Sequence, residues 1–196
     1  MAIATAMVSV WASHATADWR RQASLMPPVR PACVSSAFGP RVLPNLPAAG
    51  VYHYGIDLPA ASGAPVFAAA PGTVIRIQNK GPGGLEMLVQ HDGFVGVYSH
   101  FGQIEPRFAD GQRVEAGERL GVVGTTGVTF GAHLYFEMIL DGRPVDPAPY
   151  LRIPQCQGEG RRAPAYGIND GGTTIGGRQY WQVMPPARQY IQWHQN

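Results

Sequence analysis

The chain has 196 residues, a net charge of +2 and 45% hydrophobic residues. This length suits one domain with appended segments, and the hydrophobic content suffices for a packed core, which excludes a disordered chain. A charge this close to zero, with basic residues scattered along the chain, does not indicate binding to nucleic acid. No apolar run reaches the roughly 20 residues of a membrane-spanning helix, so we do not expect an integral membrane protein.

The first seventeen residues resemble a secretory signal. An apolar stretch at residues 2–10 precedes Ala15-Thr16-Ala17, which has the small-x-small pattern of a cleavage site. A basic start is missing, which leaves a short buried N-terminal segment as the alternative. With a signal, the protein would be exported to the periplasm or cell envelope.

Short apolar segments between turn signals dominate the middle of the chain. Twenty-five glycines and eighteen prolines interrupt any long helical period. The pattern predicts strands at residues 72–77, 85–90, 94–98, 120–124 and 133–140, with turns at residues 79–84 and at Asp141-Gly142. The predicted fold class is therefore all-β.

One short motif, His53-Tyr54-Gly55-Ile56-Asp57, has the spacing of a metal-ligand pair. Gly55 within it disfavours a helix, and on an extended segment the even spacing puts His53 and Asp57 on one face. An imidazole nitrogen and a carboxylate oxygen are common zinc ligands, and a catalytic site adds a third protein ligand and an open position for water. Taken alone, the motif also suits a tight turn in which Asp57 bonds nearby backbone amides.

Four motifs follow one another in the order of a known family. They are S-S-A-F-G-P-R at residues 35–41, H-Y-G-I-D at 53–57, Y-S-H-F at 98–101 and G-T-T-G-V-T-F-G-A-H-L-Y-F-E at 124–137. Together they resemble the LytM and lysostaphin-type zinc metallopeptidases of bacterial cell walls, over about residues 34–151. The resemblance implies an antiparallel sheet folded over a groove, and an activity that hydrolyses peptide bonds in peptidoglycan.

The resemblance implies a role for each of five polar side chains. His53 and Asp57 match two ligands of one zinc ion, and His100 and His133 match the two histidines that assist catalysis. Zinc in such a site lowers the pKa of its bound water and polarises the peptide carbonyl. Arg41 matches the arginine expected to reach the substrate, the alternative being a solvated charge.

Tyr135 stands where the family has its third zinc ligand, a histidine. A phenol has a reference pKa of about 10 and must lose its proton to bind a metal well. We therefore expect zinc to bind weakly or not at all. Within the apolar run at residues 134–139, Tyr135 also suits an aromatic side chain that fills one face of a sheet.

Cys33 and Cys156 lie just outside the two ends of the recognised region. In an exported protein this placement suggests one disulfide that closes a large loop, with about 4 to 5 kcal/mol of stabilisation in the chain-entropy model. A Cα separation well above about 7 Å would rule the bond out. Two separate free thiols are the alternative.

We divide the chain into a signal segment (1–17), a lead-in (18–33), a LytM-like domain (34–153) and a C-terminal extension (154–196). The extension is rich in glycine, glutamine and arginine, and its aromatic residues either fold back onto the domain or bind a partner. His91, just before a turn, is interpreted as a structural residue at the end of a strand.

Two functions remain open at this point. In the first, a degenerate zinc site lets the domain bind a wall peptide, or an envelope protein, in its groove without cleaving it. In the second, the protein is an active zinc endopeptidase. Tyr135 favours the first function, whereas the retention of His100 and His133 favours the second, and the fold itself does not decide between them.

Overall fold

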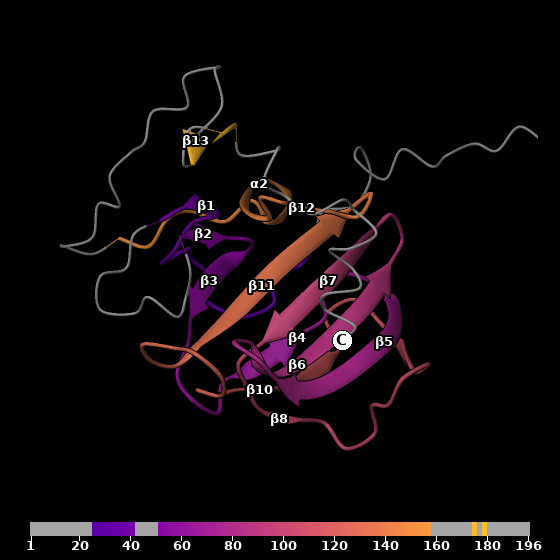
Figure 1. The fold of residues 1–196 in the computed structure, drawn as a ribbon. Coiled ribbons are helices and arrows are strands. Elements are labelled where there is room, and N and C mark those ends of the chain that lie inside the picture. The colour runs from indigo at the N-terminus through magenta and orange to yellow at the C-terminus, as the bar shows by residue number, and fades with distance from the viewer. Residues whose placement is uncertain (1–24, 42–50, 158–173, 176–177, 180–196) are drawn as a thin grey trace, which may run out of the picture.

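The computed structural model describes residues 25–41, 51–157, 174–175 and 178–179 (Figure 1). The predicted signal segment and most of the C-terminal extension lie outside these ranges. Within the extension, β13 (Thr174–Ile175) pairs antiparallel with β14 (Arg178–Gln179). None of the helices in the described ranges is long and apolar enough to cross a bilayer.

The largest element is an antiparallel sheet of seven strands, in which the long strand β11 lies next to one edge (Figure 1). β7 pairs with one edge of β11, and the other edge is shared by β3 at the start of β11 and β12 at its end. The strands, in spatial order, are β12 (Arg143–Val145), β11 (His133–Leu140), β7 (Phe94–Ser99), β6 (Gly84–His91), β5 (Gly72–Lys80) and β9 (Arg113–Val114), with β3 (Ile56–Pro59) beside β11.

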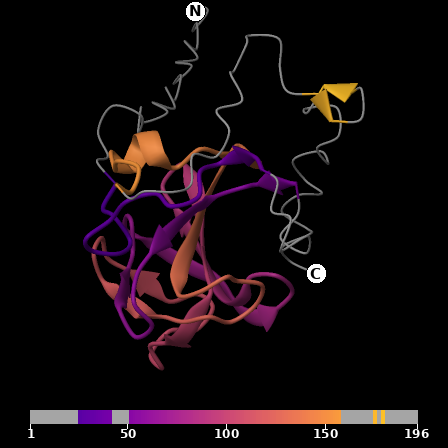
Figure 2. The ribbon, with the colours of Figure 1, turned by 90° about the vertical axis from the view of Figure 1, so that its left-hand side faces the viewer.

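Two smaller sheets complete the domain. A three-stranded sheet contains β4 (Pro65–Phe67), β10 (Arg119–Val123) and β8 (Phe101–Ile104), and a two-stranded sheet contains β1 (Gly39–Pro40) and β2 (Tyr52–His53). A single turn of helix, α2 (Ala148–Leu151), follows β12. Figure 2 shows the same arrangement from the side.

Both larger sheets contribute to the main core cluster, and a smaller cluster contains Leu88, Val97 and Ile139. Leu134, Phe136 and Met138 of β11 belong to the main cluster, as do Val66 and Leu120 of the three-stranded sheet. Because side chains alternate along a strand, the residues between them on β11 point to the opposite face of the sheet. That opposite face carries the polar residues singled out by sequence.

The lead-in also contributes to the core. Leu25 is 3% exposed and Val29 is 1% exposed, and both belong to the main cluster. The packed unit therefore includes residues before position 34, where the sequence resemblance begins.

The all-β class is confirmed, and each of the five predicted strands is present. The largest difference concerns the turn expected at residues 79–84. Asn79 pairs with Leu85 and Lys80 pairs with Gly84, so the strands continue and only three residues make the turn. The second turn, Asp141-Gly142, has positive φ at both positions (49° and 73°), as a tight hairpin requires.

Two loops meet through glycine. The turn between β5 and β6 packs against the loop at residues 124–132, where Val128 donates its backbone N–H to the Pro82 carbonyl over 2.7 Å. A Cβ at Gly84 would collide with the Gly127 backbone, and one at Gly127 would collide with the Pro82 carbonyl. Only glycine allows this approach at both positions.

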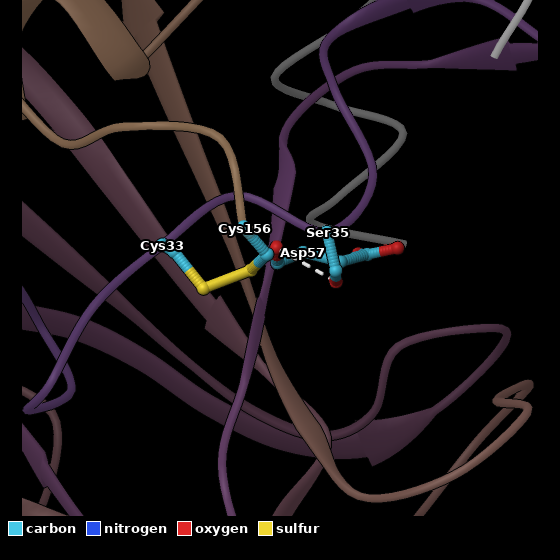
Figure 3. Close-up of a disulfide and its surroundings, with 4 residues drawn as sticks. All are labelled: Cys33, Ser35, Asp57 and Cys156. Atoms are coloured by element: carbon cyan, nitrogen blue, oxygen red, sulfur yellow. Dashed lines mark hydrogen bonds between the residues drawn. A yellow bond between two sulfur atoms is a disulfide. The ribbon is translucent and has the colours of Figure 1, made fainter. Parts of the chain in front are cut away.

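Cys33 and Cys156 form a disulfide, with Cα atoms 4.8 Å apart (Figure 3). This separation lies inside the limit of about 7 Å that such a bond requires. Since the chain has two cysteines in all, no other disulfide is available to it.

Candidate functional site

The H-x-G-x-D motif does not form one extended segment, so that expectation is wrong. His53 ends β2 and Asp57 lies in β3, and Tyr54 and Gly55, between the two strands, belong to neither. Gly55 is needed here because a Cβ would meet the Phe136 carbonyl and would come within 2.9 Å of the Tyr135 ring. The two strands nevertheless bring His53 Nε2 to 3.1 Å from Asp57 Oδ1.

Asp57 is the centre of a cluster of polar side chains that it forms with Arg41, His53, His100, His133 and Tyr135. Its Oδ1 lies 3.1 Å from His53 Nε2 and 3.4 Å from His133 Nε2, and its Oδ2 lies 3.7 Å from Arg41 Nη1. Burial raises the pKa of this carboxyl, but the two imidazoles beside it, His133 and His53, outweigh burial and hold its pKa well below the usual range. Asp57 is therefore ionised at any physiological pH.

Each histidine of the cluster is held through Nδ1 by a backbone carbonyl. The acceptors are Ala37 for His53 at 2.9 Å, Thr126 for His100 at 2.8 Å and Gly131 for His133 at 2.8 Å. Because a carbonyl can only accept, this network assigns the proton of the neutral ring to Nδ1 and the lone pair to Nε2. Metal-binding histidines are oriented in this way.

His53 carries a buried atom that lacks a hydrogen-bond partner. The residue is 2% exposed, and its Nε2 has no hydrogen bond although Asp57 Oδ1 is 3.1 Å away. In the neutral ring, both facing atoms are acceptors, so they repel unless a proton or another cation lies between them. A buried nitrogen of this kind is uncommon, and a proton or a bound cation would satisfy it.

His133 is the more exposed histidine beside Asp57. Burial lowers the pKa of His133, but its hydrogen bond to Asp57 and the charge of that carboxylate raise it overall. A protonated His133 can donate from Nε2 to Asp57 Oδ1. Arg41 supplies a cation on the other carboxylate oxygen, Oδ2.

His100 follows β7 in a left-handed backbone conformation, with φ 66°. It is 6% exposed, and its ring centroid lies 4.7 Å from that of His133. Burial, followed by the charge of His133, lowers its pKa to about 4. Such a conformation is uncommon outside glycine and is often associated with functional sites.

Thr126 positions His100 and was missed in the sequence analysis. Its carbonyl accepts from His100 Nδ1, its Oγ1 donates to the Phe101 carbonyl over 2.9 Å, and the same Oγ1 accepts from the Leu85 amide. The G-T-T-G segment was quoted only as part of the family pattern. A threonine between two glycines was the available signal.

Tyr135 lies in the row of side chains that contains Asp57. On β11 it stands opposite Asp57 of β3 and Ser99 of β7, and its ring centroid is 5.3 Å from that of His53. Its hydroxyl donates to Glu137 Oε2 over 2.7 Å. The aromatic ring therefore occupies the third-ligand position while the oxygen is bonded to a carboxylate that is 0% exposed.

The donor set is incomplete for zinc. His53 and Asp57 suit a metal, because an orphaned imidazole nitrogen and a carboxylate oxygen face each other. No three His, Cys, Asp or Glu side chains in the described ranges are arranged to hold one ion. The third position has a phenol whose oxygen bonds elsewhere, so the residues present do not fit the catalytic zinc arrangement.

Six of the residues singled out by sequence thus meet in one cluster on the outer face of the large sheet. They are Arg41, His53, Asp57, His100, His133 and Tyr135. Arg41, His133 and Asp57 keep 15–17% of their side chains exposed, so the cluster is open to solvent. Two hollows in the described part of the chain lie elsewhere, one beside β8 and β10 and one beside β5 and β9.

Comparisons with known proteins agree on one family. Residues 51–147 match peptidase family M23. Over 114 residues the chain is 34% identical to peptidoglycan DD-endopeptidase ShyA of Vibrio cholerae, a match that covers 58% of this chain and 26% of that protein. The chain therefore spans about a quarter of the length of this curated relative.

Solved structures give the same picture. A zinc-containing peptidase from Vibrio cholerae superposes with a TM-score of 0.55 and 28% identity, over 67% of this chain and 40% of that one. The catalytic domain of lysostaphin from Staphylococcus simulans superposes with a TM-score of 0.54 and 28% identity, over 60% of this chain and 90% of that one.

Proposed function

Because the chain carries a domain of peptidase family M23, we propose that it is an exported envelope protein whose domain binds a peptide of peptidoglycan without cleaving it. A peptidoglycan substrate is supported by the family and by the name of the ShyA relative. A protein of the envelope that presents a similar peptide is the other ligand the proposal allows.

One observation carries the non-catalytic part of the proposal. The Tyr135 hydroxyl donates to Glu137 Oε2 over 2.7 Å. While the phenol donates this hydrogen bond, its oxygen carries the proton that it would have to lose to bind a metal well. Two protein ligands alone would hold zinc weakly, and a zinc-activated water requires firmly held metal.

The remaining groups suit peptide binding. Arg41 offers a guanidinium donor and His133 a second donor, and Asp57 offers carboxylate oxygens that accept peptide or amine N–H groups. All three are partly exposed, so a ligand can reach them. His133 is already held by the Gly131 carbonyl and Arg41 by the Ser36 hydroxyl, so both lose little further freedom on binding.

The proposal is tested by measuring binding and cleavage on the same purified chain. Soluble stem peptides and cross-linked dimers from peptidoglycan are titrated by calorimetry, and the same mixtures are analysed by mass spectrometry after incubation with and without added zinc. We expect saturable binding with no cleavage product under either condition.

Arginine variants provide the matched control. Arg41→Ala should weaken peptide binding by about 10-fold, in line with the loss of one charge-assisted hydrogen bond of about 1.5 kcal/mol. Arg107→Ala removes an exposed arginine paired with Glu118, away from the cluster, and should leave binding unchanged. Equal effects of the two substitutions would place the peptide elsewhere.

A zinc endopeptidase is the second candidate function, favoured by one specific observation. His100 keeps an uncommon left-handed backbone and a ring bonded to Thr126, next to His133. Binding alone does not explain this arrangement, whereas acid and base catalysis uses positioned imidazoles. Stoichiometric zinc in the purified chain, together with cleaved peptide, would establish this function and overturn the first.

A further inference from the structure

The Cys33–Cys156 disulfide lies at one end of a short backbone segment, residues 33–37, that leads to the cluster and is called the ribbon below. Beyond the disulfide, Val34 donates to the Pro154 carbonyl over 2.9 Å, and Cys156 donates to the Val34 carbonyl over 3.0 Å. The covalent bond and these two hydrogen bonds attach residues 33–34 to residues 154–156. The first residues of the recognised region are thereby tied to the chain that follows α2.

The next two residues of this ribbon hold the backbone of Asp57. The Ser35 amide donates to the Asp57 carbonyl over 2.9 Å, and the Asp57 amide donates to the Ser36 carbonyl over 3.0 Å. The Ser35 hydroxyl reaches the same Asp57 carbonyl at 3.2 Å, as Figure 3 shows. On its other edge, Asp57 is paired with Tyr135 of β11.

The ribbon also reaches two other members of the cluster. The Ala37 carbonyl accepts from His53 Nδ1 at 2.9 Å, and the Ser36 hydroxyl accepts from Arg41 Nη1 at 3.3 Å. Residues 33–37 therefore contact His53, Asp57 and Arg41, and one end of this segment is fixed by a covalent bond. Nothing in the sequence motifs links the cysteines to these side chains.

We propose that the Cys33–Cys156 disulfide positions His53 and Asp57 through residues 33–37, so that reducing it loosens the cluster while the rest of the sheet stays folded. The cysteines are positioning residues, since neither touches a ligand. Both are only half-buried, so a reductant can reach them. A dithiol supplies two electrons and two protons, becomes a cyclic disulfide, and leaves two thiols on the chain.

The direct test is amide hydrogen exchange on the full chain, oxidised and reduced. The reporting amides are that of Ser35, which donates to the Asp57 carbonyl, and that of Asp57, which donates to the Ser36 carbonyl. The reference is the Val123 amide, which donates to Ala64 over 2.8 Å in the three-stranded sheet. Reduction should speed exchange at Ser35 and Asp57 by about 10-fold or more and change Val123 by less than about 2-fold, because local opening leaves the sheet intact.

Two variants separate positioning from general stabilisation. The cysteine-free chain, Cys33→Ala with Cys156→Ala, should show the fast exchange at Ser35 and Asp57 and no response to reductant. Val66→Ala opens a cavity in the core and leaves the disulfide intact. It should lower the free energy of unfolding but leave the ratio of amide exchange rates at Asp57 and Val123 unchanged. Exchange that rises uniformly over the sheet on reduction, or that stays unchanged at Ser35 and Asp57, overturns the proposal.

A binding measurement extends the test to peptide binding. This part of the test rests on the proposed function. The affinity for a soluble stem peptide should fall about 5-fold or more on reduction, since the donors and acceptors are no longer held in place. If the oxidised chain binds no peptide, the proposed function fails, whereas the exchange result still decides the positioning role. Full affinity in a reduced chain whose Asp57 exchanges fast would overturn the link between positioning and binding.

Discussion

His91 and the histidines around Asp57 differ in how their second ring nitrogen is used. His91 Nδ1 bonds to the Pro71 carbonyl at 2.9 Å, and its Nε2 lies 3.1 Å from the Tyr98 hydroxyl. That hydroxyl in turn accepts from the Ala69 amide at 2.9 Å. Every polar atom of this network is therefore satisfied inside the protein.

The cluster histidines share the Nδ1 bond to a backbone carbonyl, but within the described residues none of their Nε2 atoms is paired with a hydroxyl as in His91. His53 has a carbonyl on Nδ1, but its Nε2 is buried without a hydrogen bond. The comparison teaches that burial and a perturbed pKa do not distinguish a structural histidine from a functional one. His91 and His100 both have a pKa lowered to about 4, with burial as the largest cause. The distinguishing feature is the second ring nitrogen.

The largest effect is expected on zinc affinity when the third ligand of the zinc site is restored. Tyr135→His should raise zinc affinity more than about 100-fold, because restoring a ligand exceeds the roughly 10- to 100-fold typical of changes around the ligands. Calorimetric zinc titration measures the gain. Tyr135→Phe removes the hydroxyl without adding a nitrogen and should give no gain. Equal zinc affinity in all three chains would show that another residue already completes the site.

Removing a histidine from each region should separate stability from binding. His91→Ala should lower the free energy of unfolding by about 3 kcal/mol, since it opens a cavity and strands the Pro71 carbonyl. His133→Ala, at a 15% exposed side chain, should cost less than about 1 kcal/mol but abolish peptide binding. Urea titration measures the first quantity and calorimetry the second. If His133→Ala lowers the free energy of unfolding more than His91→Ala does, the distinction between a structural histidine and a binding histidine is wrong.

The pH dependence of stability should follow from the neutral form of His91. Its folded pKa of about 4 lies below its ordinary value of 6.5, so the unfolded chain binds protons first as the pH falls. The stabilisation is complete above pH 6.5 and is lost towards pH 4, by about 2 to 3 kcal/mol. His100 titrates in the same window. Urea titrations at several pH values should show a shallower decline for His91→Gln than for the wild type.

The smallest of these effects is expected at Gly55. A methyl group here meets the Phe136 carbonyl and the Tyr135 ring, so Gly55→Ala should cost about 2 kcal/mol by overpacking. Gly63→Ala provides a control, because a Cβ there meets nothing within 4 Å although its φ of +87° adds strain. Thermal unfolding of both variants measures the difference. Equal stability of the two would show that the ring over Gly55 yields easily.

Much of the fold could be predicted because its signal is local. Alternating apolar residues and glycine turns specify the strands at residues 85–90 and 133–140 without knowledge of their partners. The convergence of His53 with His133, 80 residues later, was expected only from the order of the motifs. Local pattern carries no information on pairing between such distant segments.

The remaining features depend on contacts that leave no mark in the sequence. The acceptors of the cluster histidines are backbone carbonyls, and any residue type supplies a carbonyl. The direction of the Tyr135 hydroxyl depends on Glu137, two positions along the same strand, where the pattern offered only an apolar run. The break at Gly55 was missed because even spacing also suits a continuous strand.

The glycine contact between the two loops limits how this family member can diverge. Gly84 and Gly127 approach so closely that neither loop has room for a side chain there. His100 bonds to both loops, through the Gly83 carbonyl at 3.0 Å and the Thr126 carbonyl at 2.8 Å. Surface loops ordinarily tolerate insertions and vary freely between relatives. Here a one-residue insertion in either loop would displace a histidine of the cluster. We therefore expect the lengths of both loops to be conserved during evolution.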